Sequence, residues 1–167
     1  MRSVWLVTAF LIMLLMIMPA IALASLTNLG ALNSTTSSYL DNKNVFIYTG
    51  PLIKGDYYAF GNCTYWVYYL RKEINQPIPT TWGNAISWAV NAQKGNYLVN
   101  NIPSFGAIMQ DPNAYGGLGH VAFVTNVNPG VNFTISEMNR VGFDEVDSRT
   151  ISFTQLSKYN FIHDQIN

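Results

Sequence analysis

Four side chains of this sequence have the types and the order that thiol-dependent hydrolysis requires. Cys63 is the only cysteine, and His120 begins an apolar run. Glu137 and Asn139 lie at the end of the next apolar run. A thiolate can attack a carbonyl carbon, an imidazole can move the proton, and a carboxylate or amide can hold the ring. A lone cysteine is also often an inert buried residue. The order and local sequence of the four residues favour the catalytic interpretation.

The segment after Cys63 is predicted to be a helix that begins at or just after the cysteine. Residues 64–74 contain no Gly or Pro, and apolar or aromatic side chains cover most of the helical circumference. Pro77 and Pro79 prevent continuation of the helix. A thiol at a helix N-terminus lies beside unpaired N–H groups and the positive end of the helix dipole, which favour the thiolate. A second short helix is predicted over residues 84–93.

The pattern changes from helical to β-strand after Gly106. Short β-prone runs occupy residues 45–48 and 106–109, and two longer runs, residues 120–126 and 131–137, flank a turn sequence, Asn128-Pro129-Gly130. These longer runs predict an antiparallel hairpin. Depending on the position of the turn, His120 lies opposite Asn139 or Glu137. Both registers place Glu137 and Asn139 on the face that carries His120, where either can orient the imidazole.

The first 24 residues have the pattern of a secretory signal peptide. Arg2 precedes an apolar run, and Ala22-Leu23-Ala24 provides a small-x-small site, so cleavage is expected before Ser25. An uncleaved membrane anchor is the alternative, because the run is close to the shortest span that crosses a bilayer. Residues 25–44, rich in Ser, Thr and Asn, are predicted to form a linker or a loosely attached arm. Residues 45–167 are predicted to form one catalytic domain, secreted to the cell wall or the periplasm.

The charge composition gives no support for a nucleic-acid partner. The chain has 9 Lys and Arg and 9 Asp and Glu, with a formal net charge of +0. Binding to phosphate backbones needs a clustered basic surface, whereas these basic residues are scattered. Asp41 and Asp56 precede the cysteine without a dense carboxylate cluster, so neither a metal nor another cofactor is predicted. His163, the other histidine, is expected to have a packing or surface role.

Several short motifs make the chain similar to the CHAP domain family, the cysteine, histidine-dependent amidohydrolases and peptidases. The resemblance runs from about residue 55 to 163 and implies a papain-like α+β fold, with N-terminal helices packed on an antiparallel β-sheet. It also implies cleavage of amide bonds in peptidoglycan, with Cys63 as nucleophile, His120 as base, and Glu137 and Asn139 as the orienting pair. The motifs, in the order that the family has them, are Gly61-Asn62-Cys63-Thr64-Tyr65-Trp66-Val67-Tyr68, Trp82-Gly83-Asn84-Ala85, Pro103-x-x-Gly106-Ala107-Ile108, Gly119-His120-Val121-Ala122-Phe123-Val124, Ile135-Ser136-Glu137-Met138-Asn139 and the closing Phe161-Ile162-His163.

Asn62 departs from the family pattern, which commonly has Gln before the cysteine as a contributor to the oxyanion hole. Because Asn is one methylene shorter, its amide is not expected to reach the same point. The Cys63 backbone N–H can still donate, and the second donor is left unassigned. Substrate contacts are expected from Asn62 and from two aromatic residues in loop-like contexts, Trp82 and Tyr115.

The leading hypothesis is therefore a secreted cysteine-dependent peptidoglycan hydrolase with no membrane partner after signal cleavage. It would be an N-acetylmuramoyl-L-alanine amidase or an endopeptidase of the stem or cross-bridge. The protein would either act without a wall-targeting module or be delivered to the wall by a separate targeting partner. A non-catalytic cell-wall-binding or assembly protein with the same fold is the alternative function. A thiol redox protein is disfavoured, because no resolving cysteine is present. The sequence leaves open which amide bond is cut.

Overall fold

The computed structural model describes residues 45–166. The predicted signal peptide at 1–24 and the predicted arm at 25–44 lie outside the described residues, and both stay predictions. The described residues belong to one compact unit. Within the described part of the chain, every helix is too short or too polar to cross a lipid bilayer.

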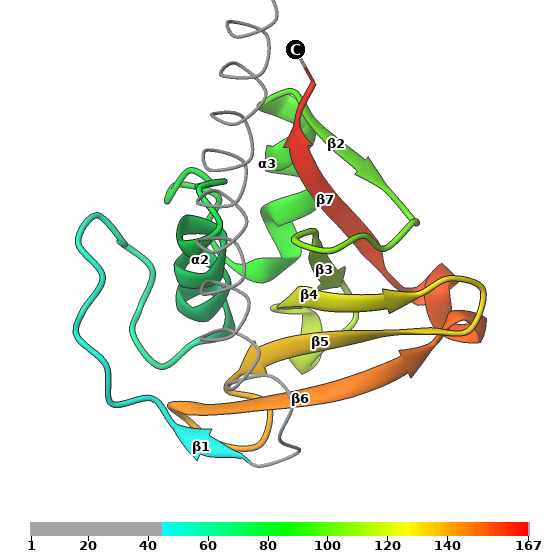
Figure 1. Cartoon of the computed structure of the whole chain (residues 1–167). Helices are drawn as coiled ribbons and strands as arrows, with labels where there is room; N and C mark the ends of the chain where they lie inside the picture. The colour runs from blue at the N-terminus through cyan, green and yellow to red at the C-terminus, as the bar shows by residue number, and fades with distance from the viewer. Residues whose placement is uncertain (1–44, 167) are drawn as a thin grey trace, which may run out of the picture. The chain divides into compact units, whose positions relative to one another are not determined.

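A seven-stranded antiparallel sheet forms the body of this unit, in the strand order β1-β6-β5-β4-β3-β7-β2 (Figure 1). Within residues 45–166, two α-helices and three short 3-10 segments accompany the sheet. This arrangement confirms the predicted α+β fold with helices packed on an antiparallel sheet. The strands are β1 (Phe46–Ile47), β2 (Tyr97–Asn100), β3 (Ile108–Asp111), β4 (His120–Asn128), β5 (Asn132–Met138), β6 (Glu145–Ser152) and β7 (Asn160–Gln165).

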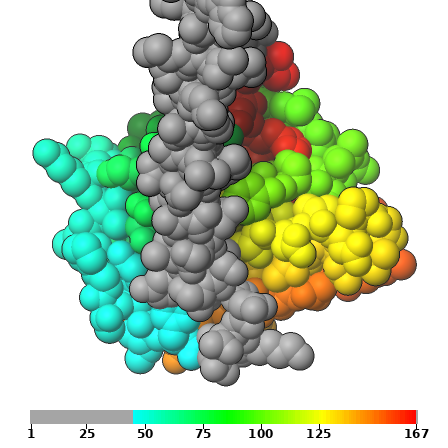
Figure 2. Space-filling model, viewed as in Figure 1, coloured from blue at the N-terminus to red at the C-terminus, as the bar shows by residue number. Residues whose placement is uncertain are grey.

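The predicted hairpin is formed by β4 and β5. The ladder closes at Asn128↔Asn132, so residues 129–131 form the loop, and Gly130 takes the positive φ of 75° that the turn needs. A register shift between Val124 and Asn126 then brings Phe123 opposite Ser136. Continued to the start of β4, this pairing corresponds to the predicted register in which His120 lies opposite Asn139. In Figure 2 the yellow surface of the hairpin lies directly above the orange surface of β6, the next strand of the sheet.

Helix α2 (Cys63–Glu73) begins at the cysteine, as predicted. Its aromatic face packs on β4 and β5, where the Trp66 Nε1–H donates to Ser136 Oγ at 2.9 Å. Trp66 and Val67 are almost fully buried, so burial against the sheet stabilises the helix more than its intrinsic propensity does. This hydrogen bond and the packing fix the start of α2 relative to the strand pair that carries His120.

The second predicted helix is present as the 3-10 turn η1 (Ala85–Ser87) followed by α3 (Trp88–Lys94). It packs on β2 and β7. Gly95 follows the last residue of α3. The loop before β4 contains the 3-10 turn η2 (Tyr115–Gly117), and η3 (Phe153–Lys158) joins β6 to β7. The sequence analysis identified none of β2, β6 and β7 as strands.

Candidate active site

Cys63 occupies the first position of α2 and is partly exposed. The preceding residue, Asn62, is the N-cap, but its side chain caps none of the helix N–H groups. Gly61 has a φ of +83°, and a Cβ there would lie 2.3 Å from Asp144 Oδ1. The turn before Cys63 therefore requires glycine, because it packs directly under the loop that follows β5. These features leave the thiol at an uncapped helix N-terminus that is held against the sheet.

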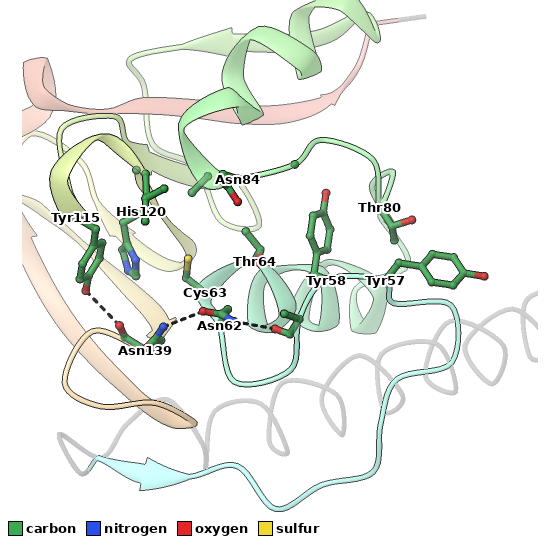
Figure 3. Close-up of a pocket in the computed structure, with 15 residues that line it drawn as sticks. Tyr57, Tyr58, Asn62, Cys63, Thr64, Thr80, Asn84, Tyr115, His120 and Asn139 are labelled. Atoms are coloured by element: carbon green, nitrogen blue, oxygen red, sulfur yellow. Dashed lines mark hydrogen bonds between the residues drawn. The ribbon is translucent and has the colours of Figure 1, made fainter.

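His120 and Glu137 lie on neighbouring strands and share one hydrogen bond. His120 Nε2 lies 2.7 Å from Glu137 Oε2, and the two residues are 3% and 0% exposed. Because Nε2 is engaged by the carboxylate, Nδ1 is the ring nitrogen that remains for Cys63. Figure 3 shows the Cys63 sulfur beside the His120 imidazole. The structure thus brings together the thiol, the imidazole and the carboxylate that the sequence analysis singled out.

The electrostatic surroundings of His120 favour its protonated form. Burial alone would lower the pKa of the imidazole, but hydrogen bonds with Cys63 and Glu137, together with the charges of both, raise it to about 9. At neutral pH the ring is therefore a cation between the Cys63 side chain and the Glu137 carboxylate. A cationic imidazole beside a cysteine can stabilise a thiolate and can act as a general acid.

Glu137 is held by more than the histidine. Arg149 donates from Nε to Oε1 at 2.5 Å, and Arg140 Nε lies 3.1 Å from the same oxygen. Arg140 also binds Asp147, the residue opposite Glu137 on β6. Burial by itself would raise the pKa of Glu137, but hydrogen bonds from His120 and Arg149, and the charges of both residues, lower it. The buried carboxylate is consequently ionised.

Sequence analysis missed the three residues Arg140, Asp147 and Arg149. The sequence does contain a strand signal here, because Asp147, Arg149 and Ile151 stand at every second position of a β-prone run after Gly142. Alternation places Asp147 and Arg149 on one face of a strand, but the chain alone does not tell which strand lies beside it. The pairing of β5 with β6 makes these residues neighbours of Glu137.

Asn139 lies at the site, but its side chain has a different partner from the one expected. It leaves the strand conformation with a φ of +64°, so it no longer follows the alternation that holds Glu137 toward His120. Its Nδ2 donates to Asn62 Oδ1 at 2.9 Å, and its backbone carbonyl accepts from the Tyr115 hydroxyl at 3.3 Å (Figure 3). The structure therefore pairs the imidazole with Glu137 and links Asn139 to Asn62, the residue before Cys63.

A cavity of about 440 Å³ opens above these groups. Among the described residues, its lining includes no Asp, Glu, Lys or Arg. The exposed aromatic rings of Tyr57 and Tyr115 belong to it, as does the half-exposed Asn62. Its walls come from the segment before α2, from the turn at η1, and from the loop before β4. The lining residues are Tyr57, Tyr58, Ala59, Asn62, Cys63, Thr64, Thr80, Gly83, Asn84, Ala85, Tyr115, Leu118, Gly119, His120 and Asn139.

Trp82 does not fit the substrate-binding role that its loop-like sequence suggested. It is 4% exposed and packs edge-on against Trp88 and Tyr97, with ring centroids 5.5 and 5.1 Å away. Although Trp82 lies in a loop between helices, burial of its large apolar ring stabilises a position in the core beside α3. Tyr115 and Asn62 do line the cavity, and their contact with a substrate stays a prediction.

The second histidine, His163, lies on β7 and outside the cavity lining. Its Nδ1 is 3.0 Å from Ser104 Oγ, and its Nε2 is 2.9 Å from Asn100 Oδ1. Burial lowers the pKa of this ring, an effect that the Asp164 charge opposes. Both nitrogens of the half-buried ring therefore have neutral partners, in line with the packing role expected for it.

Comparison with known protein families identifies the same region. The model of the CHAP domain matches residues 53–139. This match begins shortly before the turn that carries Cys63 and ends at Asn139.

Three similar proteins, two of them curated proteins and one a solved structure, come from staphylococci. A probable autolysin LDP of Staphylococcus aureus is 43% identical over 110 residues, which are 66% of this chain and 38% of that protein. The secretory antigen SsaA of Staphylococcus epidermidis is 41% identical over 130 residues, 77% of this chain and 49% of that protein. A crystal structure of an N-acetylmuramoyl-L-alanine amidase from Staphylococcus aureus superposes with a TM-score of 0.64 at 28% identity, covering 71% of this chain and 35% of that one. The chain thus spans less than half the length of these relatives.

Proposed function

Because the chain belongs to the CHAP domain family, we propose that it is a cysteine-dependent hydrolase of peptidoglycan amide bonds. The observation that carries the proposal is the ordered contact of Cys63, His120 and Glu137 at the base of an open cavity. The names of the relatives, an autolysin and an N-acetylmuramoyl-L-alanine amidase, support a cell-wall substrate.

In the first half of the reaction, the Cys63 thiolate attacks the carbonyl carbon of the scissile amide. The negative charge that develops on the carbonyl oxygen is stabilised by the backbone N–H of Cys63 and by the N-terminal end of α2. Asn62 is not assigned to the oxyanion hole, because its Nδ2 donates to the Ala59 carbonyl at 3.3 Å and its Oδ1 accepts from Asn139. Asn62 instead ties the turn before the nucleophile to the end of β5.

His120 then protonates the leaving amine, so that the C–N bond breaks and an acyl-thioester remains on Cys63. The neutral imidazole removes a proton from water, and the resulting hydroxide releases the acid product and restores the thiolate. Throughout, Glu137 holds Nε2 and stabilises the imidazolium form. No step in this sequence requires a metal or another cofactor.

Two kinds of amide bond are candidates for cleavage at this site. One is the amide between the muramic acid lactyl group and the first alanine, which an amidase cleaves. The other is an amide within the stem peptide or cross-bridge, which an endopeptidase cleaves. We further propose that residues 1–24 direct secretion of the protein, in keeping with the name secretory antigen that a relative carries.

The test is digestion of purified peptidoglycan by the protein and by its Cys63→Ala variant, followed by mass spectrometry of the soluble products. Free lactyl groups would identify an amidase, and new peptide amino termini would identify an endopeptidase. The activity must depend on Cys63. Undigested material with both proteins, accompanied by equal binding to the wall, would contradict the proposal and favour the non-catalytic wall-binding alternative.

A further inference from the structure

Glu137 has one oxygen directed at the histidine and the other directed at arginine. Oε2 meets His120 Nε2 at 2.7 Å, and Oε1 receives Arg149 Nε at 2.5 Å. Arg149 Nη2 also reaches Oε2 at 3.4 Å. Because the guanidinium is planar and rigid, contacts to both oxygens limit rotation of the carboxylate. The oxygen that faces the imidazole is therefore held from behind.

A buried carboxylate needs such a counter-charge to remain ionised. Glu137 is 0% exposed, so water does not stabilise its charge. Arg140 approaches Oε1 at 3.1 Å, but it also binds Asp147 through both Nε and Nη2. Arg149 lies closer to Glu137 and forms no ion pair with Asp147 among the salt bridges of the described residues.

The strand pairing explains how Arg149 reaches this position. β6 runs beside β5, with Asp147 opposite Glu137 and Arg149 opposite Ile135. Residues that differ by two lie on the same face of a strand, so the long Arg149 side chain extends diagonally to Glu137. Arg149 lies beyond residues 53–139, the stretch that matches the family model. The matched residues therefore contain the reactive groups but not the cation that supports them.

We propose that Arg149 is a positioning residue of the active site: it orients Glu137 toward His120 and keeps this carboxylate negatively charged, so that the imidazolium form of His120 is stabilised beside Cys63. The assignment rests on the proposed hydrolase function for its catalytic meaning. Arg149 acts through Glu137 and is not among the residues that line the cavity.

Several charged and titratable side chains influence the titration of Glu137. Those around it are His120 from β4, Asp147 and Arg149 from β6, Arg140 after β5, Cys63 from α2, Tyr115 from η2, and Tyr159 beside Arg149. Removal of Arg149 leaves Arg140 as the nearest remaining guanidinium. Arg140 also forms an ion pair with Asp147, so its charge is shared between two carboxylates. Protonation of Glu137 should then require less acid.

The experiment compares Arg149→Met with Arg149→Lys in the full chain by two substrate-independent measurements. NMR of the Glu137 side-chain carboxyl carbon should show its titration midpoint raised by about 1–3 pH units in Arg149→Met, since an adjacent cation shifts a carboxyl by that much. The acidic limb of Cys63 alkylation by iodoacetamide should move upward as well, because protonation of Glu137 removes the counter-charge of the imidazolium. Arg149→Lys should restore most of both shifts.

Arg71→Lys is the matched control for a merely structural effect. Arg71 is 2% exposed and paired with Asp164, so its replacement perturbs another buried arginine while the site remains intact. It should leave the Glu137 midpoint and the alkylation profile unchanged. Should Arg149→Met fail to fold, Arg149→Gln replaces it, because Gln retains N–H donors without the charge and should give the same upward shift.

The proposal is overturned by a folded Arg149→Met or Arg149→Gln variant whose Glu137 midpoint and alkylation profile equal those of the wild type. Peptidoglycan hydrolysis separates this failure from failure of the proposed function. Hydrolysis by the wild type with an unchanged profile in the variants would retain the hydrolase and reject the role of Arg149. Shifted midpoints in a protein that digests no peptidoglycan would support the role of Arg149 in thiol activation and reject the hydrolase.

Discussion

The two histidines of this protein have similar connections and opposite surroundings. Each ring is hydrogen-bonded through Nε2 to a side chain of another strand or its end, namely Glu137 for His120 and Asn100 for His163. On Nδ1, His163 meets a serine hydroxyl, and His120 faces the Cys63 thiol. Both arrangements resemble a nucleophile, a base and an orienter when drawn as a chain of contacts.

The difference lies in charge and access. His120 has an ionised partner and opens into the cavity, whereas His163 has an amide partner and lies outside the cavity lining. Interactions with Cys63 and Glu137 raise the pKa of His120 despite its burial, while burial lowers the pKa of His163. Connectivity alone is therefore a poor guide to catalysis, and the charge of the third residue separates the two sites.

The largest expected effect is loss of the nucleophile. Cys63→Ala should reduce peptidoglycan hydrolysis by about 10⁵-fold to 10⁶-fold, the scale seen when a nucleophile is removed from a hydrolase. Ser104→Ala, the matching change beside His163, should leave the rate within about twofold. Release of soluble fragments measures both rates. Equal losses in the two variants would remove the distinction between the sites.

The orienting carboxylate is next in size. Glu137→Gln should lower the hydrolysis rate by roughly 10²-fold to 10⁴-fold, because the imidazolium loses its counter-charge. It should also lower the free energy of unfolding by about 3–5 kcal/mol, since Arg149 and Arg140 lose their shared partner in a buried network. Rate assays and urea denaturation check the two expectations. A near-normal rate would show that charge at this position is dispensable.

The pH dependence of stability and activity tests the difference between His120 and His163 while Glu137 stays in place. The pKa of His120 is raised to about 9, so its contribution to stability is fully present below its ordinary value of 6.5 and is lost as pH rises through about 9. Protonation of the leaving amine should be lost over the same range. NMR titration of both rings, with urea denaturation at several pH values, tests this. Cys63→Ala should lower the pKa of His120, because it removes one of the groups that raise it.

The amide pair at the cavity rim should have a smaller effect. Asn62→Ala and Asn139→Ala should each slow hydrolysis about tenfold, because each removes the link between the nucleophile turn and the end of β5. The double variant should show a coupling of about 0.5–3 kcal/mol between them. Additive losses in the three variants would instead indicate that Asn139 acts separately from Asn62.

The smallest expected effect comes from giving His163 a carboxylate partner like that of His120. Asn100→Asp retains acceptors for His163 and for the Ile102 N–H, and adds a negative charge. It should raise the pKa of His163 by about 1–3 units and leave hydrolysis unchanged. NMR of the His163 ring provides the measurement. An unchanged ring pKa would weaken the conclusion that the carboxylate distinguishes the two sites.

Local patterns were sufficient to predict the parts of the fold that carry the reactive groups. The apolar circumference of residues 64–74 predicted α2, and the turn at Pro129 and Gly130 predicted the β4–β5 hairpin. Their periodicities depend on neighbouring residues and on burial of one face. The contact between His120 and Glu137 followed from strand alternation within that hairpin.

Long-range pairing limited the remaining predictions. Phe161 and Ile162 on β7 are consecutive and both fully buried, so this strand lacks the alternation that marks a half-exposed strand. Arg149 joins the site only because β6 lies beside β5. Trp82 was assigned to the cavity from its loop-like context, whereas three-dimensional packing places it in the core.

The position of Arg149 on β6 has a consequence for protein engineering. A chimera that grafted only residues 53–139 onto another module would retain the thiol, the imidazole and the carboxylate. It would also omit the partner strand of β5, and with it the guanidinium that neutralises Glu137. Such a graft would combine an exposed strand edge with an unbalanced charge in its core. A transferable unit should therefore extend at least through Ser152, the last residue of β6.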